Sequence, residues 1–501
     1  MDVLSNLMLG FGVAFQPINL LFCFAGVFIG TLIGVLPGIG PVAAMSLLLP
    51  ITFNITPEAG IIMLSGIYYG SMYGGSTTAI LVNIPGEAAS VITCLDGYQM
   101  ARQGRAGPAL GMAAMGSFIA GTAAIVGLML LAPSLARFAV KFGPTEYFSL
   151  MVLGLTILVW LSQGSILKAL IMACVGVVLG LVGIDSITAM PRLTFDKLQL
   201  IDGLGLVPIV MGLFGIAEIL SNIEQRLNRN IFETKVKGLM PTKEDWKRSA
   251  GPIARGSVLG FFLGILPGGG AVISSFLSYA MEKRLSKTPE RFGKGAIEGV
   301  AGPETANNAA AGAGFIPLLT LGIPPNVVMA LLLGAFIVHG VQPGPLLMVQ
   351  QPALFWGIVA SMYIGNVMLL VLNMPLIGLW VQLLKVPYKI LFPMILLFCV
   401  IGAYSVSNQV FDIYLMLGFG ILGWLMKKYG YEPAPLVLAF VLGPMLENNL
   451  RKALILSQGD FTPFVMRPIS AVCLAAAVLL LLSPLLPAFQ KRRKELATEE
   501  G

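Results

Sequence analysis

Long apolar stretches, separated by short polar or Pro/Gly-rich breaks, run along almost the whole chain of 501 residues. A helix needs about 20 apolar residues to cross a bilayer. Many stretches approach this length, whereas those at 41–53 and 271–281 are too short and are interpreted as return arms of re-entrant hairpins. The predicted apolar cores are 18–36, 41–53, 58–82, 107–132, 146–162, 166–183, 202–220, 252–266, 271–281, 296–322, 326–341, 352–383, 388–406, 411–426, 433–446 and 468–488.

Composition agrees with a membrane protein. Hydrophobic residues make up 56% of the chain and charged residues 11%, against about a quarter charged in soluble proteins. Such a chain cannot cover a water-facing surface, so lipid must face much of it. The net charge of +7 does not indicate a nucleic-acid partner, because the basic residues gather in a few loops, as membrane topology requires.

The two halves of the chain resemble each other. Gly26 to Gly40 reads GVFIGTLIGVLPGIG and Gly256 to Gly270 reads GSVLGFFLGILPGGG, with seven of fifteen positions identical at an offset of 230. Farther on, Ile84-Pro85 matches Ile323-Pro324 at an offset of 239. A third match pairs Gly104–Pro108 with Gly340–Pro345, and three matches in the same order indicate a duplication.

The duplication divides the chain into four parts. Residues 1–222 form a first repeat, 223–250 a hydrophilic linker loop, 251–460 a second repeat, and 461–501 a further span with a basic tail. Residues 1–101 contain no Lys or Arg, whereas the matching flank at 283–294 contains five. Cytoplasmic loops carry the excess of Lys and Arg. We therefore predict inverted repeats, with a periplasmic N-terminus and a cytoplasmic linker and tail, an arrangement typical of secondary transporters.

Each LPGxG motif interrupts an apolar stretch. Pro ends the helical hydrogen-bond ladder, and Gly permits turns that other residues avoid. Free N–H groups at the following helix N-terminus suit an anion, so we predict that these tips bind substrate carboxylates. The alternative is a plain tight turn. The candidate residues are Pro37, Gly38, Gly40, Pro267, Gly268, Gly269 and Gly270. The GxxxGxxxG run before each tip is interpreted as a close helix contact instead.

Polar groups surround the two Ile-Pro breaks. Neutral hydroxyls and amides can ligate Na⁺ or hold a carboxylate, although Ser and Thr can also bond their own helix carbonyls. The candidate substrate ligands are Ser76, Thr77, Asn83, Pro85, Asn307, Asn308, Pro324 and Asn326. The candidate Na⁺ ligands are Thr77, Asn83, Thr320 and Asn326. Glu87, Glu298 and Glu304 are acidic candidates near the breaks.

Enzyme signatures are missing from the sequence. There is no GxxxxGK[ST] loop and no GxSxG, and the single histidine, His339, excludes HExxH. A channel remains the competing class, although no filter of carbonyl rings or charged rings is evident. Neither a catalytic residue nor a cofactor is expected; Na⁺ or H⁺ would be the coupling ion.

Several long and irregular strings resemble the TctA family, the large membrane subunit of tripartite tricarboxylate transporters. They are GVLPGIGP, YYGSMYGGSTTAILVNIPGEAASV, GLVPIVMGLFGIAEIL, LGILPGGGAVISSF and GPETANNAAAGAGFIPLLTLGIPP. The resemblance covers essentially the whole chain.

This resemblance implies a complex in the bacterial inner membrane. Its partners would be a small four-span membrane subunit and a periplasmic solute-binding protein, and its activity uptake of tricarboxylates or related carboxylates driven by a cation gradient. By analogy it also implies an elevator-type motion. The expected fold is an all-α polytopic membrane protein with two inverted repeats, re-entrant hairpins and broken helices, plus an extra C-terminal span.

Overall fold

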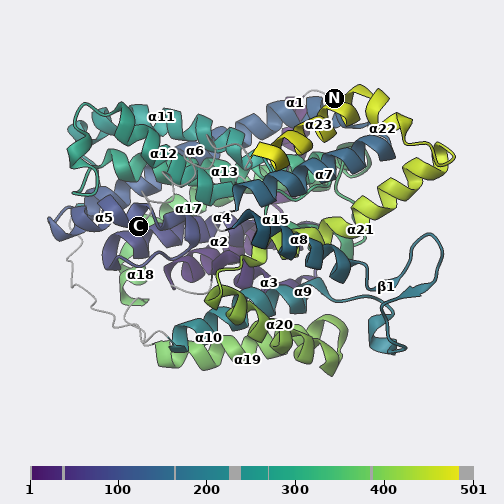
Figure 1. Ribbon diagram of the computed structural model, residues 1–501. Coiled ribbons are helices and arrows are strands. Elements are labelled where there is room, and N and C mark those ends of the chain that lie inside the picture. The colour runs from purple at the N-terminus through teal and green to yellow at the C-terminus, as the bar shows by residue number, and fades with distance from the viewer. Residues whose placement is uncertain are drawn as a thin grey trace. The chain divides into compact units, whose positions relative to one another are not determined.

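The computed structural model describes residues 3–36, 40–162, 165–224, 238–268, 270–383 and 388–483. These residues are helical almost throughout and contain one two-stranded hairpin (Figure 1). The predicted all-α class is confirmed. Contacts divide the chain into two compact units, 1–140 with 205–428 and 141–204 with 429–501.

The first unit contains both LPGxG regions and both Ile-Pro breaks. Its helices are α1 (Val3–Ala14), α2 (Pro17–Val35), α3 (Gly40–Thr52), α4 (Pro57–Val82), η1 (Ala88–Ser90), α5 (Thr93–Arg102), α6 (Ala106–Ala139), α9 (Leu206–Val210), η3 (Met211–Ile216), α10 (Ala217–Glu224), α11 (Lys243–Ile265), α12 (Gly270–Leu285), η4 (Pro289–Arg291), α13 (Glu298–Ala313), α14 (Phe315–Leu321), α15 (Val327–Val338), α16 (Leu347–Gln350), α17 (Pro352–Asn373), α18 (Ile377–Leu383), α19 (Tyr388–Ser407) and α20 (Val410–Lys428).

The second unit is built from two distant stretches of the chain. Its elements are α7 (Pro144–Leu161), α8 (Ile166–Gly180), β1 (Gly183–Ile184), β2 (Pro191–Arg192), η2 (Leu198–Leu200), α21 (Pro433–Leu456), α22 (Thr462–Met466) and α23 (Pro468–Leu482). Helix α8 packs so tightly on α21 that a Cβ at Gly176 would lie 2.1 Å from the Leu436 carbonyl oxygen. Between α7 and α23, the Ser149 and Ser470 hydroxyls lie 2.6 Å apart. The two strands pair antiparallel, Gly183 with Arg192.

Six helices of the described residues are long and apolar enough to cross a membrane. They are Pro17–Val35, Ala106–Ala139, Pro144–Leu161, Leu206–Glu224, Pro352–Asn373 and Val410–Lys428. Shorter apolar helices accompany them, including α3. The chain is therefore a multi-pass membrane protein.

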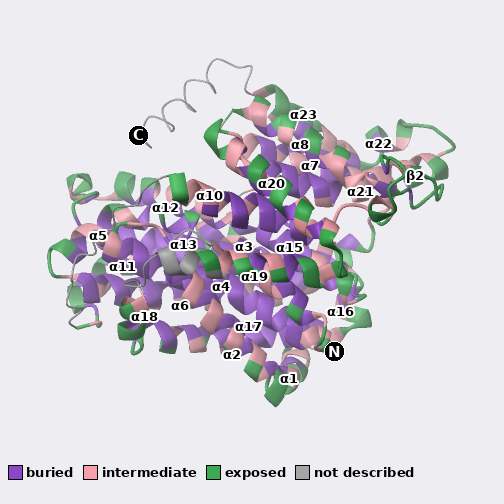
Figure 2. Ribbon diagram, turned by 90° about the horizontal axis from the view of Figure 1, so that it is seen from below, coloured by how far each residue is buried: buried purple, intermediate pink, exposed green. Residues whose placement is uncertain are grey.

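Helices α4 and α13 are enclosed by protein on every side. All residues from 59 to 81 of α4 and from 299 to 313 of α13 are buried (Figure 2). Thr56 starts α4 by accepting a hydrogen bond from the Ala59 N–H at its side-chain oxygen. Both helices are rich in small and polar residues, so polar groups are concentrated in the interior of this unit, where lipid does not reach them.

Glycines at four-residue spacing bring α2 against α4 and α11 against α13. A Cβ added at any of six glycines would lie within 2.6 Å of a backbone oxygen of the partner helix. The glycine–carbonyl pairs are Gly26–Met63, Gly30–Ile67, Gly34–Ser71, Gly256–Gly302, Gly260–Ala306 and Gly264–Ala310. The predicted close-packing role of the GxxxGxxxG runs is confirmed. The first three pairs map onto the last three by the offsets found in the sequence, 230 and 239.

Most predicted cores match helices, with some differences. Helices α3 and α12 begin at Gly40 and Gly270, next to the predicted return arms. The stretch 243–250, predicted as part of the linker loop, belongs to α11, because Thr242 and Asp245 form a capping box that starts the helix. Residues 225–237 of that linker, and the tail beyond 483, lie outside the described residues.

Two predicted single segments are divided in the structure, and several helices were missed. The segment 352–383 separates into α17 and α18 around Pro375, and 296–322 separates into α13 and α14 at Gly314. Pro removes a backbone donor and disfavours a helical residue before it, which accounts for the first division. Helices α1, α5, α16 and α22 were not predicted.

Candidate functional site

The two Ile-Pro breaks have the same backbone design. Helix α4 ends at Asn83 (φ 56°) and α14 ends at Gly322 (φ 71°), both in the left-handed region. After the extended Ile-Pro stretch, Glu87 and Asn326 act as N-caps of the next helices. Glu87 accepts from the Ala89 N–H at 2.6 Å, and Asn326 from the Met329 N–H at 3.0 Å. The two breaks therefore correspond at an offset of 239, as the sequence predicted.

Two buried carboxyl groups, those of Glu87 and Glu304, lie beside α4. The Ser76 hydroxyl donates to Glu304 Oε2 at 2.5 Å, and the Thr93 hydroxyl to Glu304 Oε1 at 2.5 Å. Glu304 is fully buried and Glu87 is 8% exposed. Glu87 packs on the neighbouring turn, since a Cβ at Gly75 would lie 2.8 Å from its Cγ. Both carboxyl groups thus flank residues 75–76.

Two amides of α13 extend this group. Asn307 Nδ2 approaches Glu87 Oε1 at 3.5 Å, and its Oδ1 is buried without a hydrogen-bond partner. Asn308 Nδ2 donates to the Ser117 hydroxyl of α6 at 2.7 Å. We call the set of Ser76, Thr77, Glu87, Thr93, Ser117, Glu304, Asn307 and Asn308 the polar cluster.

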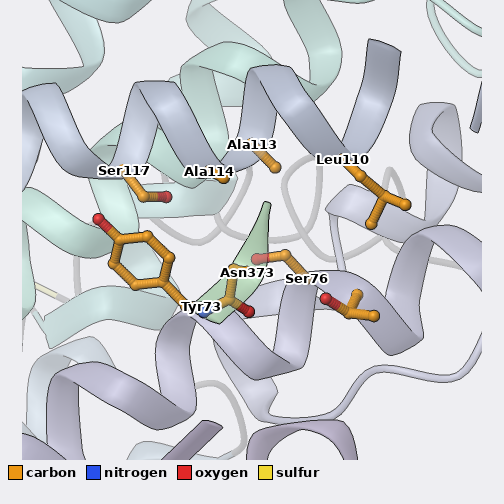
Figure 3. Close-up of a pocket in the computed structure, with 8 residues that line it drawn as sticks. Tyr73, Ser76, Leu110, Ala113, Ala114, Ser117 and Asn373 are labelled. Atoms are coloured by element: carbon orange, nitrogen blue, oxygen red, sulfur yellow. The ribbon is translucent and has the colours of Figure 1, made fainter. Parts of the chain in front are cut away.

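A pocket opens along one edge of the polar cluster. Its volume is about 10 Å³, between α4, α6 and the end of α17, and it is lined by Tyr73, Ser76, Thr77, Leu110, Ala113, Ala114, Ser117 and Asn373 (Figure 3). Asn373 lines it with a buried Oδ1 that has no partner. The wall combines small apolar residues with hydroxyls and one amide, and a volume of this size holds about one water molecule or a small ion.

In each half, described residues at or just before the LPGxG tip lie beside the Ile-Pro break of the same half. The Gly268 N–H (φ 78°) donates to the Pro325 carbonyl at 2.9 Å. In the first half, a Cβ at Gly86 would lie 1.9 Å from the Gly34 carbonyl oxygen. Pro37, Gly38 and Gly269 lie outside the described residues. Gly40 and Gly270 start their helices with positive φ and open space beside them, and Pro267 is half-buried.

The other predicted residues differ in their surroundings. Ser76, Thr77, Asn307 and Asn308 come together in the polar cluster. Asn326 lies next to it, with its Nδ2 3.3 Å from the Tyr68 hydroxyl. Thr320 donates to its own helix at the Ile316 carbonyl, the alternative weighed for such residues. Asn83 is exposed, Pro85 is half-buried and Pro324 is buried. Glu298 faces Arg248 and Arg291, at 4.0 and 3.7 Å.

Sequence reasoning did not single out Tyr73, Thr93, Ser117 or Asn373. The available signal was polarity inside an apolar segment, because Ser117 lies within the predicted 107–132 core and Asn373 within 352–383. In the described part of the chain, no three His, Cys, Asp or Glu side chains gather in a way that could hold a metal ion.

Comparisons with known proteins agree with these features. The family model described as "Tripartite tricarboxylate transporter TctA family" matches residues 20–438. Two similar proteins come from Agrobacterium vitis. One, an uncharacterized 52.8 kDa protein in the TAR-I ttuC′ 3′ region, is 55% identical over 500 residues, with 100% of each chain covered. The other, an uncharacterized protein in the TAR-II ttuC′ 3′ region, is 56% identical over 241 residues, covering 48% of this chain and 100% of its own length.

No solved structure matches the chain. The family match spans most of the sequence and includes both LPGxG motifs and both Ile-Pro breaks. The family is one of transporters and not of enzymes. The chain therefore belongs to the tripartite tricarboxylate transporter TctA family and is a membrane component of such a transporter.

Proposed function

We propose that this protein is the translocating subunit of a secondary transporter that takes up tricarboxylates or related carboxylates. It acts in the bacterial inner membrane with a small four-span subunit and a periplasmic solute-binding protein, and a gradient of Na⁺ or H⁺ drives it. The observation that carries the proposal is the buried polar cluster with its adjoining pocket, because buried polar groups in membrane proteins mark solute and ion pathways.

The duplication is supported by matching contacts, and the inversion of the two repeats by the distribution of Lys and Arg. Six glycine–carbonyl contacts, two left-handed breaks and two N-caps correspond between the halves by the same two offsets. Transporters with such repeats bind their solute near the bilayer midplane, at interrupted helices. We therefore assign the solute carboxylates to the LPGxG tips and the polar cluster together.

The tips would hold carboxylates through helix N-terminal N–H groups. In this structure the Gly268 N–H is bonded to the Pro325 carbonyl. This bond ties the tip to the break of its own half, and it leaves the N-terminal N–H groups of α12, which begins at Gly270, for the solute. Alternating access would follow from movement of the tip-bearing hairpins against helices such as α6 and α17.

The proposed topology has a direct test. The N-terminus is assigned to the periplasm and the linker and tail to the cytoplasm, from the distribution of Lys and Arg. Single cysteines at Ser5 and at Lys243 should differ in labelling by an impermeant reagent, with only position 5 labelled from outside. Lys243 is preferred because the neighbouring Thr242 caps α11. Labelling of position 243 but not of position 5 would refute the orientation.

Uptake into proteoliposomes that contain the whole complex tests the activity itself. A coupled transporter shows saturable uptake of a tricarboxylate such as citrate that requires the binding protein and a Na⁺ or H⁺ gradient. Solute flux without a gradient and without saturation would instead indicate a channel, the alternative class.

A further inference from the structure

The buried carboxyl groups of the polar cluster accept hydrogen bonds but have no positively charged side chain beside them. Glu304 accepts two hydroxyl hydrogen bonds, and Glu87 accepts a backbone N–H and faces an amide. Among the described residues, no Lys, Arg or His lies within 4.0 Å of either carboxylate. Burying an ionised carboxylate without a compensating charge is strongly unfavourable.

An unpartnered oxygen lies beside the same two groups. Asn307 is one helical turn beyond Glu304 on α13, so the two side chains share a face. Its Nδ2 is directed at Glu87, and its buried Oδ1 has no hydrogen-bond partner. Buried amide oxygens are rarely left unsatisfied. An amide oxygen, two carboxylates and two hydroxyls are the ligand types that a hard monovalent cation prefers.

We propose that a single coupling cation, Na⁺ or a proton, binds between Glu87 and Glu304. For Na⁺, the Asn307 amide turns over so that Oδ1 takes the place of Nδ2 beside Glu87, and with the hydroxyls of Ser76 and Thr93 it completes the site. Access is available from the pocket, because Ser76 both lines the pocket and contacts Glu304. The role in coupling rests on the proposed function; the binding site itself does not.

This site differs from the ligand set that the sequence suggested, which used neutral residues at the breaks. Tyr68 of α4 and Cys94 of α5 are titratable side chains near the pair. Three charged groups on the surrounding helices, Asp96, Arg255 and Glu282, are bonded elsewhere. Asp96 accepts from the Gly295 and Ala296 N–H groups, and Arg255 of α11 pairs with Glu282 of α12.

Thermal unfolding of the purified full-length chain tests the site without any solute. A ligand that binds only the folded state raises the melting temperature by mass action. In the Na⁺ arm, NaCl is compared with choline chloride at a fixed alkaline pH; in the proton arm, pH is lowered in choline chloride. The wild type should be stabilised in one of the two arms, and that arm identifies the cation.

The variants Glu87→Gln and Glu304→Gln separate this site from a purely structural role. Each removes a buried charge, so each should be at least as stable as the wild type in cation-free alkaline buffer and should lose most of the response to the cation. For Na⁺, Asn307→Ala should raise the half-saturating concentration by about tenfold, the scale seen when a supporting ligand is lost. For a proton, Asn307→Ala should leave the pH response in place.

Glu244→Gln is the matched control, since Glu244 is exposed on α11. It should retain the wild-type response. The proposal is overturned if both glutamine variants lower the melting temperature equally with and without cation, or if the wild type responds in neither arm. Failure of the wild type to transport any carboxylate would refute the proposed function instead, because this assay contains no solute.

Discussion

The break after α4 and the break after α14 share a backbone but differ in their side chains. Asn83 and Gly322 make the same left-handed turn, and Glu87 and Asn326 cap the next helix in the same way. One cap is an acid and the other a neutral amide. The geometry of the duplicated unit has thus been kept while its chemistry has diverged.

The same divergence extends along the helices. Tyr68 and Tyr69 of α4 correspond to Asn307 and Asn308 of α13, and the position that matches Glu304 is Ser65. Ser65 is fully buried, with no partner for its hydroxyl. Each half therefore contributes one carboxylate, from a different place. We infer that the shared frame provides movement and the unlike side chains provide a site for unlike ligands.

The largest expected effect concerns the shared frame. Gly30→Val and Gly260→Val place a branched side chain 2.6 and 2.1 Å from backbone oxygens that cannot shift independently. Overpacking of this kind destabilises by about 1–3 kcal/mol or more. Both variants should melt several degrees below the wild type. Gly12→Val, on a helix with open space beside it, is the control. A wild-type melting temperature for either variant would contradict the equivalent packing of α2 on α4 and of α11 on α13.

The next effect concerns the second tip. Gly268→Val should abolish uptake while the protein still inserts, because a branched residue at φ 78° is strained by about 1–2 kcal/mol. The companion Gly38→Val tests the matching position of the first tip. Gly378→Val, exposed and without neighbours, should transport normally. Normal uptake by both tip variants would show that LPGxG is only a tight turn and does not bind the solute.

A smaller effect is expected from the neutral ligands. Thr77→Ala and Asn326→Ala should reduce uptake and raise the cation concentration for half-maximal rate by about tenfold, since linked ligands weaken each other reciprocally. The exposed Asn83→Ala should change this value less. Asn326→Ser retains a helix cap and separates ligand loss from the cap, which is worth about 1 kcal/mol. Wild-type cation dependence in all three alanine variants would exclude neutral ligands at the breaks.

The smallest expected effect is on the free energy of unfolding, at the left-handed residues Asn83 and Gly322. Asn83→Gly should change the free energy of unfolding by no more than about 0.5 kcal/mol, as for other exposed positions. The reverse exchange, Gly322→Asn, should be clearly destabilising, because a Cβ there would lie 2.6 Å from the Pro343 carbonyl oxygen. Equal melting temperatures for the two variants would contradict the described packing around Gly322.

Much of the fold was predictable because hydropathy and Pro/Gly breaks report local structure. The boundaries of α3, α4, α12 and α15 lie within a few residues of the predictions. The early start of α11 was missed because a capping box is a polar signal outside the apolar run. The polar cluster was only partly predictable. Thr93 meets Glu304 across 211 residues of sequence, and such a contact depends on how whole helices pack.

The division of the second unit into two distant stretches has a consequence for how the protein is made. Helices α7 and α8 leave the ribosome long before α21 and α23, against which they pack. At 5–20 residues per second, the roughly 250 residues between α8 and α21 take about 10 to 50 seconds to synthesise. During that interval α8 can pack on α7, but its Gly176 and Gly180 lack α21, against which they lie in the finished protein. A nascent chain arrested before residue 433 should therefore depend on insertion factors or membrane proteases in a way that the finished chain does not.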